Sequence, residues 1–207
     1  MRAFSRLTPL VAVLVAGLAL AACNKKTASE GDEMSMGDAN AKVTMVEYAS
    51  ASCPHCARFN NNVFPDFKKK YVDTGQVRYV FREFLTPPYP LAAAGFLTAR
   101  CAGKDKYFTV LDAVYRAQEQ MFESGDFRGP LLKIAQSAGL SEQQFNACIQ
   151  DEKALKALSD RVERFAKEDK IEGTPTFIIN GKPLPPSTHE TTLADLDAAI
   201  AAAKAGK

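Results

Sequence analysis

Residues 43–59 read VTMVEYASASCPHCARF, an apolar strand-like run that leads into two cysteines and continues as a helix-like run from Ala57. Valine and tyrosine in the apolar run are typical of a strand. The motif CPHC at residues 53–56 therefore lies where a strand passes into a helix. Pro54 suits the first helical position, because its φ is fixed near the helical value and its missing N–H would have no partner there.

The cysteines of this motif, Cys53 and Cys56, are placed for making and breaking one disulfide. Backbone N–H groups in the first turn of a helix lack partners, and the helix dipole is positive there. A thiolate at Cys53 would lie against these donors, which lowers its pKa and makes it a good nucleophile and leaving group. His55 adds to this effect if its imidazole points at the sulfur. The motif predicts a redox-active pair in which Cys56 resolves a mixed disulfide.

Three other uses of the cysteine pair fit less well. A zinc site needs a second such pair or spaced histidines, but the chain has one CxxC and two histidines, one of them inside the motif. A c-type haem attachment needs histidine directly after the second cysteine, where Ala57 stands. A structural disulfide that closes so small a loop gains little entropy. We therefore favour a redox-active Cys53–Cys56 pair. We expect no cofactor besides this disulfide and no metal site.

The N-terminus is typical of a targeting segment. Residues 1–22 combine two arginines with an apolar run and are predicted to be a signal peptide. The run ends in LAAC at residues 20–23, which resembles a bacterial lipoprotein box with Cys23 as the lipidated residue. An ordinary signal peptide with Cys23 incidental is the alternative, and an uncleaved anchor is disfavoured because the apolar run is short. Asn24 differs from the aspartate that resembles an inner-membrane retention signal, which favours the outer membrane.

Export would place the protein in the bacterial cell envelope, lipid-anchored and facing the periplasm or another extracytoplasmic space. Disulfides persist in such oxidising compartments. Residues 23–40 are small, polar and without periodicity, so we expect a flexible tether between the lipid and the domain.

Five cysteines are an odd number for an exported protein. One for lipid and two for catalysis leave Cys101 and Cys148, both in helix-like segments. They are predicted to pair as a structural disulfide, which over a loop of about 48 residues would contribute at most roughly 4 kcal/mol. Two separately buried thiols are the alternative.

Composition indicates one ordinary globular domain. The chain has 207 residues, 46% of them hydrophobic, and a formal net charge of +2. The lysine run at residues 68–70 fits a solvated helix end better than a nucleic-acid patch, so no nucleic-acid partner is expected.

Periodicity and turn signals give the element order β-α-β, a helical block of about 80 residues, then β-β-α. A capping box at Ser141 with Gln144 starts one helix of the block, and Asn180-Gly181 is a hairpin turn signal. The block has no internal repeat and indicates one insertion in a small α/β domain. The expected elements are strands at 42–50, 76–85, 176–179 and 182–184 and helices at 54–72, within 91–170 and from 192 to about 204.

The CPHC motif, the inserted helices and the sequence GTPTF at residues 173–177 together resemble the DsbA family of thioredoxin-fold thiol:disulfide oxidoreductases. The likeness is greatest to the branch with lipoprotein and DsbG-like members. It implies an α/β thioredoxin fold over residues 41–205 with a helical insertion at about 89–170.

The resemblance also implies two walls of the site. Pro175 matches the family's cis-proline, which would present the backbone of Thr174 to a substrate strand. Glu47 matches a buried acid beneath the active site that would accept the proton of Cys56. An ordinary trans proline and an outward-facing glutamate are the alternatives.

The implied function is that of an oxidase, a monomer that introduces disulfides into exported unfolded proteins with cysteines. A membrane DsbB-like partner would reoxidise it. An isomerase or reductase is the alternative, because Thr174 occurs in both kinds of relative and Ser52 replaces the aromatic residue seen before the first cysteine. Such relatives usually carry a dimerisation domain, for which residues 23–40 are too short. A tethered chaperone or copper-binding module that uses His55 and the cysteines is a third hypothesis.

Overall fold

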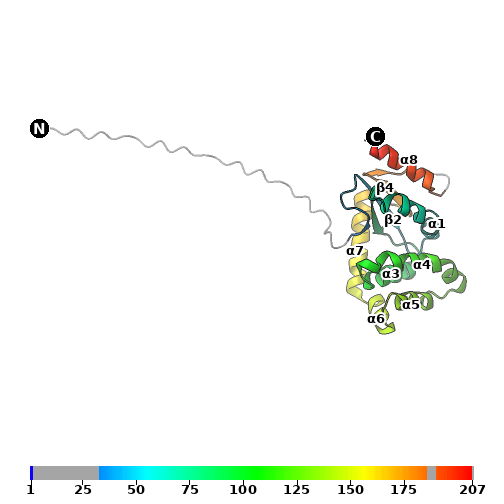
Figure 1. Cartoon of the computed structure of the whole chain (residues 1–207). Coiled ribbons are helices and arrows are strands. Elements are labelled where there is room, and N and C mark those ends of the chain that lie inside the picture. The colour runs from blue at the N-terminus through cyan, green and yellow to red at the C-terminus, as the bar shows by residue number, and fades with distance from the viewer. Residues whose placement is uncertain (2–32, 186–189, 207) are drawn as a thin grey trace.

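The computed structural model describes Met1 and residues 33–185 and 190–206 (Figure 1). The predicted signal peptide, the lipidation at Cys23 and most of the predicted tether lie outside the described residues. Within the described part of the chain, no helix is both long and apolar enough to cross a membrane.

A five-stranded sheet with strand order β1-β3-β2-β4-β5 forms the centre of the fold. β2 and β3 are parallel and the other pairs are antiparallel. A parallel pair needs a crossover connection, which the helices between β2 and β3 provide. The strands are β1 Met34–Met36, β2 Val43–Ala49, β3 Val77–Glu83, β4 Thr176–Ile179 and β5 Lys182–Pro183.

Helices cover both faces of the sheet. Alternate residues of β2 point to opposite sides: Met45 joins the main core with α1 and α8, while Tyr48 packs with Phe165 of α7 on the other face. In Figure 1, α3 to α6 gather at one end of the molecule and α7 leads back to the sheet. The helices are α1 Pro54–Asn62, α2 Phe64–Phe67, the π-helix η1 Lys68–Val72, α3 Tyr89–Cys101, α4 Lys104–Ser124, α5 Arg128–Ser137, α6 Glu142–Ile149, α7 Glu152–Asp169 and α8 Leu193–Lys204.

The predicted thioredoxin fold with an inserted helical domain is confirmed. The insertion comprises α3 to α7, and Cys101 and Cys148 form a disulfide that joins α3 to α6 with a Cα–Cα distance of 6.3 Å. The predicted capping box at Ser141 and Gln144 is present at the start of α6. Buried Glu83 at the end of β3 binds arginines of α3 and α7, so an ionic cluster also ties the insertion to the sheet.

Two expectations about the chain outside the site were wrong. β1 lies in the predicted tether of residues 23–40: Met34 is 6% exposed and pairs with Phe81, so the fold begins before residue 41. Three residues among polar neighbours are too few to show strand periodicity. The single helix expected over 54–72 is divided near Val63, because Pro65 lacks the N–H that a continuous helix would need.

Candidate active site

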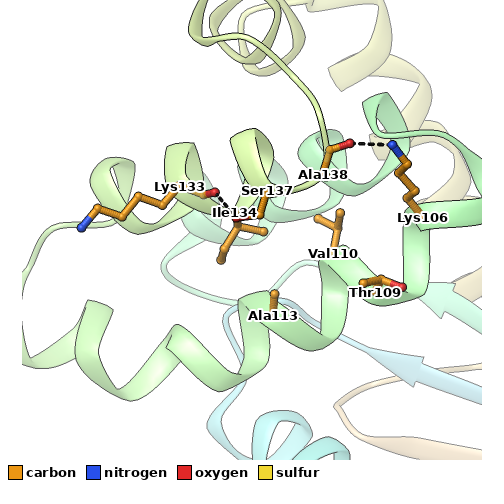
Figure 2. Close-up of a pocket in the computed structure, with 8 residues that line it drawn as sticks. All are labelled: Lys106, Thr109, Val110, Ala113, Lys133, Ile134, Ser137 and Ala138. Atoms are coloured by element: carbon orange, nitrogen blue, oxygen red, sulfur yellow. Dashed lines mark hydrogen bonds between the residues drawn. The ribbon is translucent and has the colours of Figure 1, made fainter.

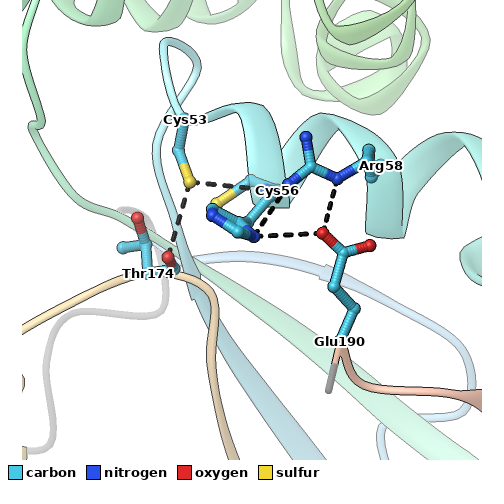
Figure 3. A network of polar contacts seen from close by, with 6 residues as sticks. Cys53, Cys56, Arg58, Thr174 and Glu190 are labelled. Atoms are coloured by element: carbon cyan, nitrogen blue, oxygen red, sulfur yellow. Dashed lines mark hydrogen bonds and ion pairs between the residues drawn. The ribbon is translucent and has the colours of Figure 1, made fainter. Parts of the chain in front are cut away.

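The CPHC motif forms the start of α1, as its sequence predicts. Cys53 is the N-cap residue with extended backbone angles, and Pro54 occupies the first helical turn. Cys53 Sγ accepts a hydrogen bond from the backbone N–H of Cys56 at 3.4 Å (Figure 3). Both cysteines are free thiols and both are buried. The sequence thus places one sulfur at a helix N-terminus and the second sulfur one turn further on.

The two thiols differ in acidity. A hydrogen bond from the thiol of Cys56 is the largest cause that lowers the pKa of Cys53, to about 6. The side chain of Thr174 and the backbone N–H groups of Cys56 and His55 also lower this pKa, and burial opposes them. Burial, and then the neighbouring sulfur of Cys53, raises the pKa of Cys56 well above its ordinary value. Near neutral pH, Cys53 is therefore a thiolate and Cys56 holds its proton. Cys53 is then the nucleophile of the reduced pair and the sulfur that a substrate thiolate attacks in the disulfide.

Thr174 and Pro175 form the wall opposite Cys53. The peptide bond between them is cis, the isomer expected from the sequence. Cys53 Sγ lies 3.4 Å from the carbonyl oxygen of Thr174 (Figure 3). Thr174 Oγ1 is buried and has no hydrogen-bond partner that meets normal geometry among the described residues, yet this hydroxyl lies close enough to Cys53 to favour its thiolate.

Glu47 lies beneath the cysteines on β2. Its side chain points inward, and the residue is only 3% exposed, so the outward-facing alternative is excluded. Tyr79 donates a hydrogen bond to Glu47 Oε2 at 2.7 Å, but burial outweighs this and raises the Glu47 pKa to about 8. The carboxyl group is thus protonated for most of the time at neutral pH. Its charge, when present, raises the pKa of Cys56, so a Glu47 carboxylate makes Cys56 hold its proton more tightly.

The imidazole of His55 makes its hydrogen bonds away from the sulfur. Nδ1 lies 3.1 Å from Glu190 Oε1 and 2.9 Å from Arg58 Nη2, and the side chain is 62% exposed. Arg58 and Glu190 also pair with each other (Figure 3). His55 acts on Cys53 through its backbone N–H, so the condition that its imidazole faces the sulfur is not met.

The segment before Cys53 is held by hydrogen bonds from hydroxyl groups. The sequence analysis did not predict these bonds. Ser52 Oγ donates to the carbonyl of Thr86 at 2.7 Å and lies 3.2 Å from Ser50 Oγ. Ser50 in turn accepts from the backbone N–H of Thr86, and its carbonyl accepts from the N–H of Cys53 at 3.0 Å. Serine before the first cysteine therefore gives a buried polar anchor in place of an aromatic rim.

A cleft of about 920 Å³ opens beside the motif. Its apolar lining includes Phe59, Val63, Phe177 and Leu184, and Thr174 and His55 also line it. An open cleft with apolar walls next to the half-buried backbone of Thr174 can accept an extended peptide. Among the described residues, no group of three or more His, Cys, Asp or Glu side chains is arranged to hold a metal ion.

A reactive dithiol at a helix N-terminus, opposite a cis-proline on a mixed sheet, defines a thioredoxin-fold protein equipped for thiol–disulfide exchange. A family model described as Thioredoxin matches residues 29–201. A Rickettsia bellii protein named "Putative protein-disulfide oxidoreductase" is 32% identical over 174 residues, which are 84% of this chain and 66% of that protein.

Solved structures agree with this relationship. Alpha-DsbA1 of Wolbachia pipientis superposes with a TM-score of 0.73 at 27% identity, covering 84% of this chain and 92% of that one. A protein-disulfide isomerase from Novosphingobium aromaticivorans, at 22% identity and a TM-score of 0.72 over 82% of this chain and 96% of that one, shares the fold. The chain belongs to the thioredoxin family, as a DsbA-like member.

Proposed function

We propose that this protein is a thiol:disulfide oxidoreductase that introduces disulfides into exported proteins through Cys53 and Cys56. The observation that carries the proposal is the acidic thiol of Cys53 at the start of α1, in contact with Thr174 and beside an apolar cleft. The named activity of the Rickettsia relative supports it, although this chain spans only about two thirds of that relative's length. The cysteine pair is the redox group, and no other cofactor is required.

The reaction starts from the Cys53–Cys56 disulfide. A substrate thiolate attacks Cys53, a mixed disulfide forms, and Cys56 leaves as a thiolate that takes up a proton from Glu47. A second substrate thiolate attacks the substrate sulfur of the mixed disulfide and displaces Cys53 as a thiolate. Two electrons pass from the substrate to the pair, and the substrate gains one disulfide. Glu47 accepts the proton of Cys56 when the pair is reoxidised.

The acidity of Cys53 supports the oxidising direction. A fall in pKa from 9.0 to about 6 stabilises the reduced form at pH 7 by about 1.4 kcal/mol, which makes the disulfide more oxidising by roughly 30 mV. This acidity lies between the values of about 7 for thioredoxin and about 3.5 for DsbA.

The cellular setting rests on the sequence. We propose that Cys23 carries a lipid that tethers a monomer to the envelope membrane, with the outer membrane favoured. A membrane DsbB-like protein would accept two electrons from Cys53 and Cys56 after each turnover.

The test is made on protein lacking residues 1–23, because the described fold starts later. Its reduction potential is measured against glutathione, and a Cys56→Ser variant is used to trap mixed disulfides with exported proteins. A potential above about −200 mV with trapped substrates supports the oxidase, whereas a thioredoxin-like value near about −270 mV would establish a reductase. Absence of any mixed disulfide, with metal binding by the thiols, would favour the copper-binding hypothesis.

A further inference from the structure

Gln118 is a polar residue in an otherwise apolar face of α4. Leu111, Val114 and Met121 occupy the same buried face, and Gln118 is only 2% exposed. A buried amide is costly unless it is hydrogen-bonded. Gln118 Nε2 donates to the carbonyl oxygen of Ala51 at 3.0 Å and to that of Cys53 at 3.3 Å. Both bonds cross from the helical insertion to the segment that carries the reactive sulfur.

The carbonyl of Cys53 has a second role in the local structure. It accepts the N–H of Ala57 at 3.1 Å, the first hydrogen bond of α1. Gln118 therefore holds the peptide group that starts the helix, and the next N–H groups of the same turn are those that face Cys53 Sγ. A rotation of this peptide group would turn those donors away from the sulfur.

Another helix of the insertion, α3, packs against the same segment. A Cβ atom placed on Gly95 of α3 would lie 2.9 Å from the Cβ of Ala51, so α3 and this segment are in close contact. Ala51 is thus held by packing from α3 and by hydrogen bonding from α4. The start of α1 carries the cysteines, and the insertion fixes the backbone that leads into it.

We propose that Gln118 is a positioning residue of the active site, which holds the carbonyls of Ala51 and Cys53 so that the thiol of Cys53 stays against the first turn of α1. The proposal rests on the thiol–disulfide exchange proposed above and adds a specific role for the helical insertion in it. Gln118 touches no reacting atom and acts through the backbone.

The test compares Gln118→Met with Val110→Ala in the full chain. Methionine keeps the volume of glutamine but donates no hydrogen bond. Val110 lies on the same helix and is 2% exposed, but it faces a cavity of about 380 Å³ next to α5 (Figure 2). The measured quantities are the melting temperature, the Cys53 pKa from thiolate absorbance, and the equilibrium constant with glutathione.

We expect a lower melting temperature in both variants and a changed Cys53 pKa in Gln118→Met alone. Its Cys53 pKa should rise by about one unit, which shifts the glutathione equilibrium constant at pH 7 about fivefold against the reduced pair. If the Cys53 pKa and the equilibrium constant stay at the wild-type values in folded Gln118→Met, the positioning role is wrong and Gln118 serves stability alone.

A shorter amide covers the case in which Gln118→Met does not fold. Gln118→Asn keeps the polar group but lacks one methylene, so it cannot reach both carbonyls. Its Cys53 pKa should rise by about half a unit, and an unchanged pKa would overturn the proposal. The thiol titration needs no substrate, so it remains informative even if wild-type protein forms no disulfides, a result that would count against the proposed function instead.

Discussion

The sulfur of Cys53 lies 3.4 Å from the carbonyl oxygen of Thr174, a residue 121 positions further along the chain. The N-terminus of α1 and the segment before β4 therefore share one site. A substrate strand that bonds to the backbone of Thr174 would bring its own cysteine to Cys53. The same residue acts on the thiol with its side chain, which leads to the first prediction.

Thr174→Val should raise the Cys53 pKa from about 6 by about half a unit. Valine keeps the shape of threonine but lacks the hydroxyl that favours the thiolate. Titration of the thiolate absorbance measures the shift. Thr176→Val is the matched control, because the hydroxyl of Thr176 donates to the carbonyl of Gly173 instead. Equal pKa values in the two variants would contradict the role given to Thr174.

Glu47→Gln should stabilise the protein increasingly as pH rises. The carboxyl has a pKa of about 8 when folded and 4.5 otherwise, so below pH 4.5 it is neutral in both states. Between pH 4.5 and 8 the unfolded chain loses the proton first, and stability falls by about 1.4 kcal/mol per pH unit. Glutamine removes this loss, and we expect a gain of about 2–4 kcal/mol at pH 7 and little gain at pH 5.

Urea unfolding of reduced protein at both pH values measures the effect of Glu47→Gln, because the Glu47 pKa of about 8 applies to the free thiols. Glu142→Gln is the control, because Glu142 is an exposed glutamate with an exposed arginine partner and should show no such trend. Disulfide exchange should be slower in Glu47→Gln, since the variant lacks the proton donor that we propose for Cys56. A variant with wild-type exchange rates would show that Glu47 handles no catalytic proton.

The sequence predicts those parts of the site that depend on residues close together in the chain. Cys53 and Pro54 stand directly before a helix-like run, where proline suits the first turn, and an acid such as Glu47 stands out in an apolar strand. Gln118 is harder to find, because its partners are backbone carbonyls of a segment 65 and 67 positions away. A polar residue at a core position of an amphipathic helix was the available signal.

The misplaced start of the fold and the orientation of the His55 side chain, which the sequence left open, also depend on contacts that are distant in the chain. β1 has three residues, and only its pairing with β3 makes it a strand. The side chain of His55 is directed by Arg58 and by Glu190, a residue 135 positions away, so no local pattern could orient it. Tertiary contacts between residues far apart in the chain determine these features. A short stretch of sequence does not reveal such contacts.

Replacing Cys101 and Cys148 together with alanine should lower the free energy of unfolding by about 3–4 kcal/mol. The disulfide joins residues 47 positions apart, and its loss frees the unfolded chain over that loop. Urea unfolding of oxidised protein measures the change. The Cys53 pKa should stay at its wild-type value, because neither cysteine is among the groups that act on it. A loss below about 1 kcal/mol would contradict the entropic account.

The acidity of Cys53 should make a contribution to the stability of the reduced protein that grows as pH rises, opposite in sign to the contribution of Glu47. The Cys53 pKa is about 6 when folded and 9.0 otherwise, so between these values the unfolded chain holds a proton that the folded chain has lost. This contribution is present at high pH and is lost as pH falls through 6. Relative to reduced Cys53→Ser, which keeps Cys56 and Glu47, reduced wild type should gain about 2 kcal/mol between pH 5 and pH 7.5. Urea unfolding under reducing conditions measures the difference, and a difference that does not change with pH would show that the folded protein does not stabilise the Cys53 thiolate.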